Sequence, residues 1–235
     1  MDRMGRNAMS GKGRGLGIAA LVVGLVGLLL GLGGLAYARY AFGGSVVSSE
    51  SMTPAYGPGD RAVYERIDGS EVRRGDVVVF SAPDRYGPDG LVMGRVIGVG
   101  GDRVACCTGT EADASVTMNG KPLEEPYVKG GDAHGGYPAS YDVRVPEGRL
   151  FVMGDNRANS RDSRAFPDDH GGTIPESAVR GRVINDYAVP AVLGTAMILG
   201  VLLVPVGIGL GIAAMVVRRK ARAMMPPPPP WAVQV

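Results

Sequence analysis

Two long stretches of the chain carry no charged residue, and each lies near one end. The first runs for 24 residues, 15–38, between Arg14 and Arg39. At about 1.5 Å per residue, a helix of this length exceeds the roughly 30 Å hydrocarbon core of a bilayer. The second covers residues 187–217 and ends at the basic cluster 218–222. The pattern predicts two transmembrane helices, the second kinked at Pro205.

The first stretch has a competing interpretation as a cleaved secretory signal, because Ala36-Tyr37-Ala38 resembles a small-residue cleavage site. The apolar core of a signal peptide usually covers about 7–15 residues. The greater length here favours an uncleaved anchor. Both stretches contain pairs of glycines with GxxxG spacing, Gly27 with Gly31 and Gly207 with Gly211. In segments so rich in glycine we interpret this spacing as coincidence rather than as a helix-pairing surface.

The middle of the chain alternates between short apolar or β-branched runs and clusters of Gly, Pro, Asn and Asp. This pattern is typical of β-strands joined by turns. Asn119-Gly120 predicts a type I′ hairpin turn, and residues 126–141 resemble a long surface loop. We therefore expect a mainly β domain, with strands at 77–80, 91–99, 103–106, 115–118, 141–145 and 150–153.

Charge is distributed unevenly. Residues 1–14 have a net charge of +3 and residues 218–222 carry four basic groups, whereas residues 40–187 hold 16 basic and 22 acidic groups. The positive-inside rule places both termini in the cytoplasm and the acidic middle across the membrane. The middle lacks the basic footprint of a nucleic-acid-binding domain. The expected layout is a cytoplasmic N-terminus (1–14), a span (15–38), an extracytoplasmic domain (39–186), a span (187–217) and a cytoplasmic tail (218–235).

The cysteines and histidines are too few for a metal centre. Two cysteines cannot build a four-thiolate zinc site, and His134 and His170 lie 36 residues apart. Cys106 and Cys107 are adjacent, and because successive side chains of a strand point to opposite faces, we expect two unpaired thiols. The tail contains five consecutive prolines, which predict polyproline II without a packed fold. A ligand for a proline-binding domain is the alternative for this tail.

Three polar segments carry candidate chemistry. The first is Ser49-Glu50-Ser51-Met52-Thr53-Pro54, shortly after the first span. The second, residues 94–102, is an apolar strand that ends in a glycine turn. The third, residues 154–164, alternates Asp, Arg, Asn and Ser after another apolar strand. Asp and Arg side chains can pair in bidentate fashion, so this third segment predicts a rigid hydrogen-bonded loop rather than a solvated run of charges.

Together, in this order and at this distance from the first span, the three segments resemble the type I signal peptidases. The family pattern is Ser-x-Ser-Met-x-Pro, Gly-Asp, Lys-Arg-x-x-Gly-x-x-Gly-Asp and Gly-Asp-Asn-Arg-x-x-Ser-x-Asp-Ser-Arg. The resemblance covers residues 45–187, and the second span and the Arg-rich composition are similar to actinobacterial members. It implies an antiparallel β domain flanked by two transmembrane helices, and a membrane serine endopeptidase that removes signal peptides from exported preproteins. It also implies no metal or nucleotide cofactor, contact with membrane lipid and association with the secretion machinery.

By resemblance, Ser51 is the nucleophile, and the Ser49 hydroxyl with the Ser51 backbone N–H forms the oxyanion hole. Ser160 matches the serine that orients the general base. Val47, Met52 and Met93 are candidates for lining shallow pockets that accept small residues one and three positions before the cut. The remaining matches are expected to organise the site, with Asp155 paired to Arg95: Asp60, Arg95, Asp155, Arg157, Asp162 and Arg164.

The sequence departs from the family at the general base. A serine hydroxyl needs a base to take its proton, and bacterial members use a lysine directly before the arginine that is Arg95 here. This sequence has Gly94 at that position. Arg95 remains protonated and cannot act as the base. We expect a glycine there to leave a void large enough for water.

Three interpretations follow from Gly94. In the first, the chain is an active peptidase with a displaced base, His134 or Lys129. In the second, it is a non-catalytic relative that binds signal peptides or a membrane partner. In the third, an active lineage has had its base changed to glycine, by natural loss or by design. Changing Ser51 to Ala in an activity assay tests for serine catalysis, and restoring lysine at position 94 should restore or greatly raise cleavage.

Overall fold

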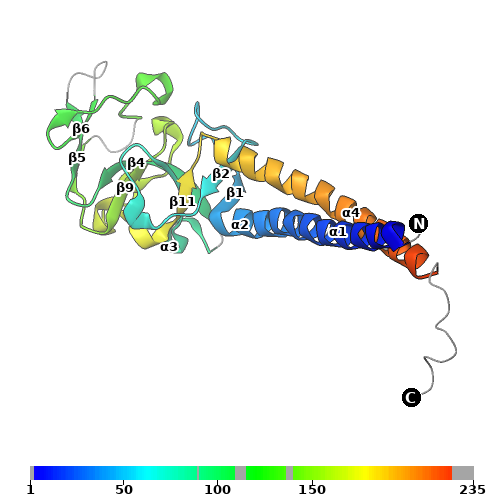
Figure 1. The fold of residues 1–235 in the computed structure, drawn as a ribbon. Helices are drawn as coiled ribbons and strands as arrows, with labels where there is room; N and C mark the ends of the chain where they lie inside the picture. The colour runs from blue at the N-terminus through cyan, green and yellow to red at the C-terminus, as the bar shows by residue number, and fades with distance from the viewer. Residues whose placement is uncertain (1–2, 89, 109–114, 136–139, 224–235) are drawn as a thin grey trace. The chain divides into compact units, whose positions relative to one another are not determined.

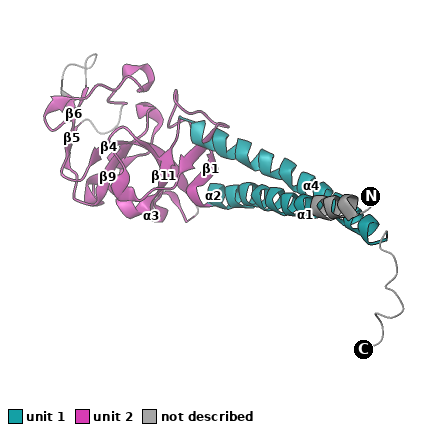
Figure 2. Cartoon of the chain, viewed as in Figure 1, with its two compact units in different colours: residues 1–39, 186–235 teal, residues 40–185 magenta. Residues whose placement is uncertain are grey.

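The structure is a computed structural model of the 235-residue chain that describes all residues except 1–2, 89, 109–114, 136–139 and 224–235. Figure 1 shows the order of its helices and strands. The chain forms two compact units: residues 1–39 with 186–235, and residues 40–185 (Figure 2).

The first unit is a pair of long helices formed by the two uncharged stretches. One consists of α1 (Arg3–Leu28), a π-helical turn (Leu29–Gly33) and α2 (Gly34–Ala41), and the other is α4 (Ala188–Ala223). Residues 14–41 and 188–223 are long and apolar enough to cross a membrane. The first helix begins at Arg3 and ends at Ala41, so it extends beyond both ends of the uncharged stretch 15–38, and α4 extends past residue 217 to Ala223.

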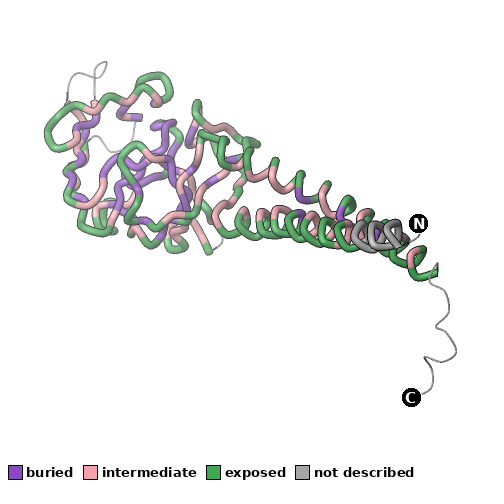
Figure 3. The backbone as a smooth tube through the Cα atoms, viewed as in Figure 1, coloured by how far each residue is buried: buried purple, intermediate pink, exposed green. Residues whose placement is uncertain are grey.

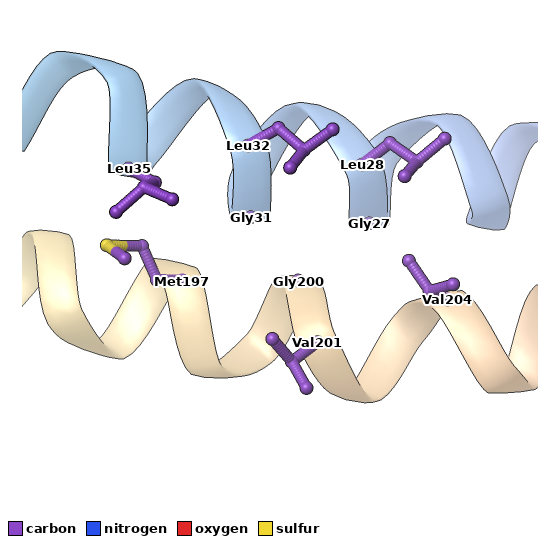
Figure 4. A pocket seen from close by; sticks show the side chains of 9 residues that line it. All are labelled: Gly27, Leu28, Gly31, Leu32, Leu35, Met197, Gly200, Val201 and Val204. Atoms are coloured by element: carbon purple, nitrogen blue, oxygen red, sulfur yellow. The ribbon is translucent and has the colours of Figure 1, made fainter.

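The expectation that the glycine spacing is coincidental is wrong. A Cβ at Gly27 would lie 3.0 Å from the carbonyl oxygen of Gly200, and one at Gly200 would lie 2.5 Å from the backbone nitrogen of Gly31. A Cβ at Gly207 would lie 2.8 Å from the nitrogen of Gly24. The two helices therefore pack backbone to backbone at these glycines, as small residues permit. Beside this contact lies an apolar pocket of about 240 Å³, bordered by Leu28, Leu32, Leu35, Met197, Val201 and Val204 (Figure 4).

The second unit contains two antiparallel sheets. The larger has the strand order β1-β2-β11-β3-β4-β9-β10. Its strands are β1 (Phe42–Val46), β2 (Arg61–Glu65), β3 (Val77–Ser81), β4 (Leu91–Val99), β9 (Arg149–Met153), β10 (Ile174–Pro175) and β11 (Val179–Val183). A short helix, α3 (Pro83–Tyr86), connects β3 to β4. Buried positions concentrate inside this unit (Figure 3).

The smaller sheet has the order β7-β6-β5-β8, with β5 (Arg103–Thr108), β6 (Ser115–Met118), β7 (Lys121–Pro122) and β8 (Tyr141–Arg144). The predicted hairpin turn is confirmed. Met118 pairs with Lys121 across it, and Asn119 and Gly120 both have positive φ, 53° and 81°. A type I′ turn requires positive φ at both central residues.

The expectation of two unpaired thiols is wrong, because Cys106 and Cys107 are joined in a disulfide. The pairing of β5 with β6 is irregular between Ala105 and Thr108. The alternation of side chains that would separate two adjacent cysteines therefore does not hold at this place. Cys106 is buried in a cluster with Phe151 and Met153.

Candidate active site

Ser51 lies in a tight turn that its neighbour Met52 anchors in the core. Met52 is fully buried. Within the turn, the N–H of Thr53 donates to the carbonyl of Glu50 at 3.1 Å, and that of Tyr56 donates to the carbonyl of Met52 at 2.9 Å. Ser51 itself is partly exposed. The turn therefore fixes the backbone of Ser51 and leaves its hydroxyl accessible.

The hydroxyl of Ser51 faces that of Ser49. The two Oγ atoms are 3.0 Å apart, and either can be the donor. Among the described residues, Ser49 is the hydrogen-bond partner of Ser51 Oγ, and no carboxylate, imidazole or amine reaches it. The structure therefore brings together the two serines expected to form the nucleophile and the oxyanion donor, and no base from the described residues is hydrogen-bonded to Ser51 Oγ.

The polar loop 154–164 holds the Ser51 turn in place. The N–H of Asn156 donates to the Ser51 carbonyl at 2.9 Å. The side-chain amide of Asn156 donates to the Glu50 carbonyl at 3.1 Å and to the Thr53 hydroxyl at 3.2 Å. Because Asn156 is buried, these bonds form in a region from which most water is excluded.

The expected pairing of Arg95 with Asp155 is present. Arg95 Nε donates to Asp155 Oδ1 at 2.8 Å, Nη2 donates to Oδ2 at 2.6 Å, and Nη1 donates to the carbonyl of Gly75 at 2.9 Å. Burial alone would lower the pKa of Arg95, but hydrogen bonds and the charge of Asp155 outweigh it and raise the pKa above its ordinary value. Arg95 is therefore a fixed cation and a structural link between β4 and the end of β9.

Asp162 and Arg164 form a second, fully buried pair. Arg164 Nε and Nη2 donate to the two oxygens of Asp162 at 2.8 Å each. Asp162 also accepts the N–H of Gly154 at 3.0 Å, and Arg164 donates to the carbonyl of Arg157 at 2.9 Å. The interpretation of this loop as hydrogen-bonded rather than solvated is confirmed for its buried charges, because Asp162 and Arg164 pair with each other and Asp155 pairs with Arg95.

The partner of Arg157 comes from a segment that the sequence did not point to. Arg157 is almost fully buried, and its Nη1 donates to Glu125 Oε2 at 3.0 Å. Burial would lower the pKa of Arg157, but the hydrogen bonds and charge of Glu125 raise it above its ordinary value. Glu125 lies 32 residues earlier in the chain, next to a proline, and carries no motif that marks it.

The segment 125–129 lies against the candidate site. The ring of Tyr127 packs under the guanidinium of Arg95, 4.0 Å from ring centre to Cζ. The N–H of Lys129 donates to the Asp155 carbonyl at 3.0 Å. Val128 is buried. The expectation that residues 126–141 form a surface loop is thus wrong for this part of it, whereas residues 136–139 lie outside the described chain.

Neighbouring core side chains occupy the space beside Gly94. The expected water-sized void is therefore absent from the described structure. A Cβ on Gly94 would lie 2.5 Å from Cγ1 of Val152 and 3.6 Å from the ring of Phe80. Gly94 is buried, and both neighbours belong to one core cluster with Val96. The core has closed over this position, so that any side chain at residue 94 requires Val152 to move.

Ser160 is buried close to Ser51. Gly154 lies between them: a Cβ at residue 154 would collide with Ser160 Oγ and would lie 2.5 Å from the Ser51 carbonyl oxygen. Close approach of the loop to the Ser51 turn therefore requires glycine at 154. Gly154 thus brings two of the predicted site residues, Ser51 and Ser160, close together.

A groove of about 410 Å³ runs past Ser49 and Ser51. Val47, Met52 and Met93, the predicted pocket residues, all line it. Residues 90–93 also line it. β3 pairs with residues 91–95 of β4, whereas β9 pairs with residues 95–99 on the other edge. Residues 91–94 therefore keep one edge that no strand of the described chain covers.

Among the described residues, the other candidates form no hydrogen bond with the Ser51 hydroxyl. Asp60 is exposed and accepts the N–H of Gly57 at 2.8 Å, which fits an architectural role in the turn before β2. The carbonyl of His134 accepts a bond from Arg164 at 3.1 Å. Lys129 is exposed, and its backbone N–H donates to the carbonyl of Asp155 in the loop.

Comparison with known proteins gives a consistent result. A family model described as signal peptidase, peptidase S26, matches residues 18–187. A probable signal peptidase I-1 of Synechocystis is 34% identical over 177 residues, which cover 71% of this chain and 79% of that protein. The signal peptidase I of Mycobacterium tuberculosis is 32% identical over 187 residues, 58% of this chain and 62% of that protein. The chain thus spans less than two thirds of the mycobacterial relative. A solved signal peptidase I from Enterococcus faecalis is similar at 26% identity and a TM-score of 0.36, covering 48% of this chain and 97% of that one.

Proposed function

The chain belongs to the signal peptidase family, peptidase S26, and we propose that it cleaves signal peptides from preproteins with Ser51 as its nucleophile. As a signal peptidase it is a membrane-anchored serine endopeptidase, a hydrolase. The observation that carries the proposal is the Ser49–Ser51 hydroxyl pair at the side of the groove, held by the buried loop 154–164.

The groove supports binding of an extended peptide. The uncovered edge of residues 91–94 can accept a peptide as an added strand, because unpaired backbone groups on a strand edge pair with an extended chain. Val47 and Met52 also line the groove. Such a strand would alternate its side chains, so that the residues one and three positions before the cut face the same wall. This matches a requirement for small residues at those two positions.

The reaction begins when Ser51 Oγ attacks the carbonyl carbon of the scissile bond. The oxyanion that forms accepts hydrogen bonds from the Ser51 N–H and the Ser49 hydroxyl, and one such donor typically contributes several kcal/mol. Asp155, Arg157, Asp162 and Arg164 hold the site without exchanging protons. Asp60 and Arg95 complete this scaffold.

The proton of Ser51 must pass to a group other than residue 94. Lys129 is the displaced base that the backbone contacts favour. Its N–H bonds to the Asp155 carbonyl, and the N–H of the same peptide unit bonds to the Ser51 carbonyl. Two such steps separate the backbones by roughly 10 Å, about twice the spacing of paired strands. An extended lysine side chain is needed to cover that distance, so we expect slow turnover.

The two apolar helices anchor the chain in the membrane, with the basic ends 1–14 and 218–235 in the cytoplasm and the domain 39–186 outside. The spans correspond to residues 15–38 and 187–217. Contacts with membrane lipid and with the secretion machinery belong to the same proposal, since the preprotein reaches the enzyme while its signal peptide is in the bilayer.

The direct test is cleavage of a preprotein by the purified full chain in detergent, followed by mass spectrometry of the products. Ser51→Ala should abolish the cut after the signal peptide, since the nucleophile is gone. Ser70→Ala, which changes an exposed serine outside the groove, is the control. Equal cleavage by the Ser51→Ala variant would overturn the proposal.

A further inference from the structure

The groove beside Ser51 contains one formal charge. Its walls are apolar or carry hydroxyl groups and the amide of Asn159, and among the described residues that line it, Arg161 alone is charged. Arg161 lies next to Ser160 in the sequence and is exposed to solvent. An extended peptide in the groove therefore meets a single cation.

Arg161 is held in position rather than free to sweep the surface. Its guanidinium lies 5.0 Å from the ring centre of Phe166, within the range of a cation–π contact. The hydroxyl of Tyr86 donates to the Arg161 carbonyl at 2.8 Å. Tyr86 also packs edge-on against Phe166, with ring centres 5.7 Å apart. Two aromatic residues thus contact Arg161, Tyr86 at the backbone carbonyl and Phe166, which Arg85 also covers, at the side chain.

The neighbouring carboxylates are already engaged by other groups. Asp162 is paired with Arg164, and Asp169 is paired with Arg85. Glu50 is approached by the amide of Asn159 at 3.4 Å. In the described part of the chain, no carboxylate lies within ion-pair distance of Arg161. Among the described residues, Arg161 therefore has no ion-pair partner, and a carboxylate of a bound peptide can supply one.

We propose that Arg161 selects substrates that carry an acidic side chain near the scissile bond. This inference rests on the proposed function, because it assigns specificity within the same groove. A guanidinium and a carboxylate form directional, bidentate hydrogen bonds, so an aspartate or glutamate is preferred to a neutral residue. A lysine or arginine at the same substrate position is repelled by Arg161. Specificity is then the difference in affinity between the acidic and the basic peptide.

The test is a scan of labelled signal-peptide segments that differ at one position, from five residues before the cut to five after it. Each position carries Asp, Ala or Lys in turn. Binding to the full chain in phosphatidylcholine nanodiscs is measured by fluorescence anisotropy, and cleavage is followed in parallel. At one position or two neighbouring ones, Asp should bind roughly threefold to tenfold more tightly than Lys. Arg161→Gln should remove this difference, and Arg161→Glu should reverse it.

Arg144→Glu is the matched control, because it makes the same charge change at an exposed residue of the smaller sheet. It should leave the preference intact. An unchanged Asp-over-Lys preference in Arg161→Glu would overturn the inference. So would an equal change at every position, or an effect of Arg161→Glu confined to phosphatidylglycerol nanodiscs, which would assign the residue to lipid. If no peptide binds and none is cleaved, the proposed function itself fails.

Discussion

The loop 154–164 and residues 92–95 of β4 both build the candidate site, but they differ in how the surrounding protein depends on them. Every buried charge between Asp155 and Arg164 has an ion-pair partner. Removing one partner therefore leaves the other buried without a counter-charge. Gly94, in contrast, has no side chain on which another residue depends, and Val152 and Phe80 occupy the space beside it. Losing a buried scaffold charge lowers the free energy of unfolding, whereas the loss of the base at position 94 is compensated by packing. The base position can therefore change while the fold stays intact.

The largest effect is expected from the loop. Asp162→Asn leaves Arg164 buried without its counter-charge, which typically costs about 3–5 kcal/mol of unfolding free energy. Thermal and urea unfolding followed by circular dichroism measure the change. The control is Asp142→Asn, which breaks the exposed pair with Arg103 and should leave the unfolding midpoint unchanged. Equal midpoints for both variants would show that the loop charges are not needed for stability.

A base restored at position 94 should give the next largest effect. Gly94→Lys combined with Val152→Ala should raise preprotein cleavage by about 10²-fold, because a positioned base replaces a displaced one. Gly94→Lys alone should destabilise the domain by about 1–3 kcal/mol, since Val152 leaves no room for the new side chain. Initial rates and melting temperatures of the two variants, with Val152→Ala as the control, separate these effects. No gain in the double variant would mean that position 94 is irrelevant to the base.

A smaller effect is expected from the displaced base. Lys129→Met should lower the rate of the unmodified chain by about tenfold, the effect of a modestly placed base. It should have little effect in the Gly94→Lys, Val152→Ala background, because the base there is supplied from β4. Lys121→Met, an exposed lysine in the hairpin of the other sheet, is the control. An unchanged rate in Lys129→Met with His134→Gln inactive would assign the base to His134.

The smallest effect is expected from an exposed acid. The side chains of His170 and Arg85 lower the pKa of Asp169 from 3.8 to about 2 through hydrogen bonds. Because the folded pKa is lowered, this stabilisation is complete above about pH 4 and is lost as the pH falls toward 2. Asp169→Asn should therefore flatten a small part of the acid-unfolding curve in that window. Parallel curves for the variant and the parent would show that Asp169 makes no contribution.

The sequence alone predicted those strands whose own residues favour extended structure. The runs 77–80 and 150–153 are β-branched or apolar throughout, and both are strands in the structure. β1 was missed because Phe42-Gly43-Gly44-Ser45-Val46 has two glycines and no apolar run. It becomes a strand because it pairs with β2 over its full length. β11 similarly depends on pairing with β2 and β3, since its Val-Arg-Gly-Arg-Val sequence has little local preference.

The same division applies to the site. Residues close together in the sequence, such as Ser49 with Ser51 and Asp162 with Arg164, have contacts that the sequence pattern predicts, because a few peptide bonds limit how far apart they can lie. Glu125 beneath Arg157, Tyr127 beneath Arg95 and Val152 in the space of residue 94 come from segments distant in the chain. Their contacts depend on strand register and on close packing of the core. Neither is encoded in any local pattern. Only the tertiary structure therefore decided which partner each buried charge has, and that Val152 occupies the space where a side chain of residue 94 would lie.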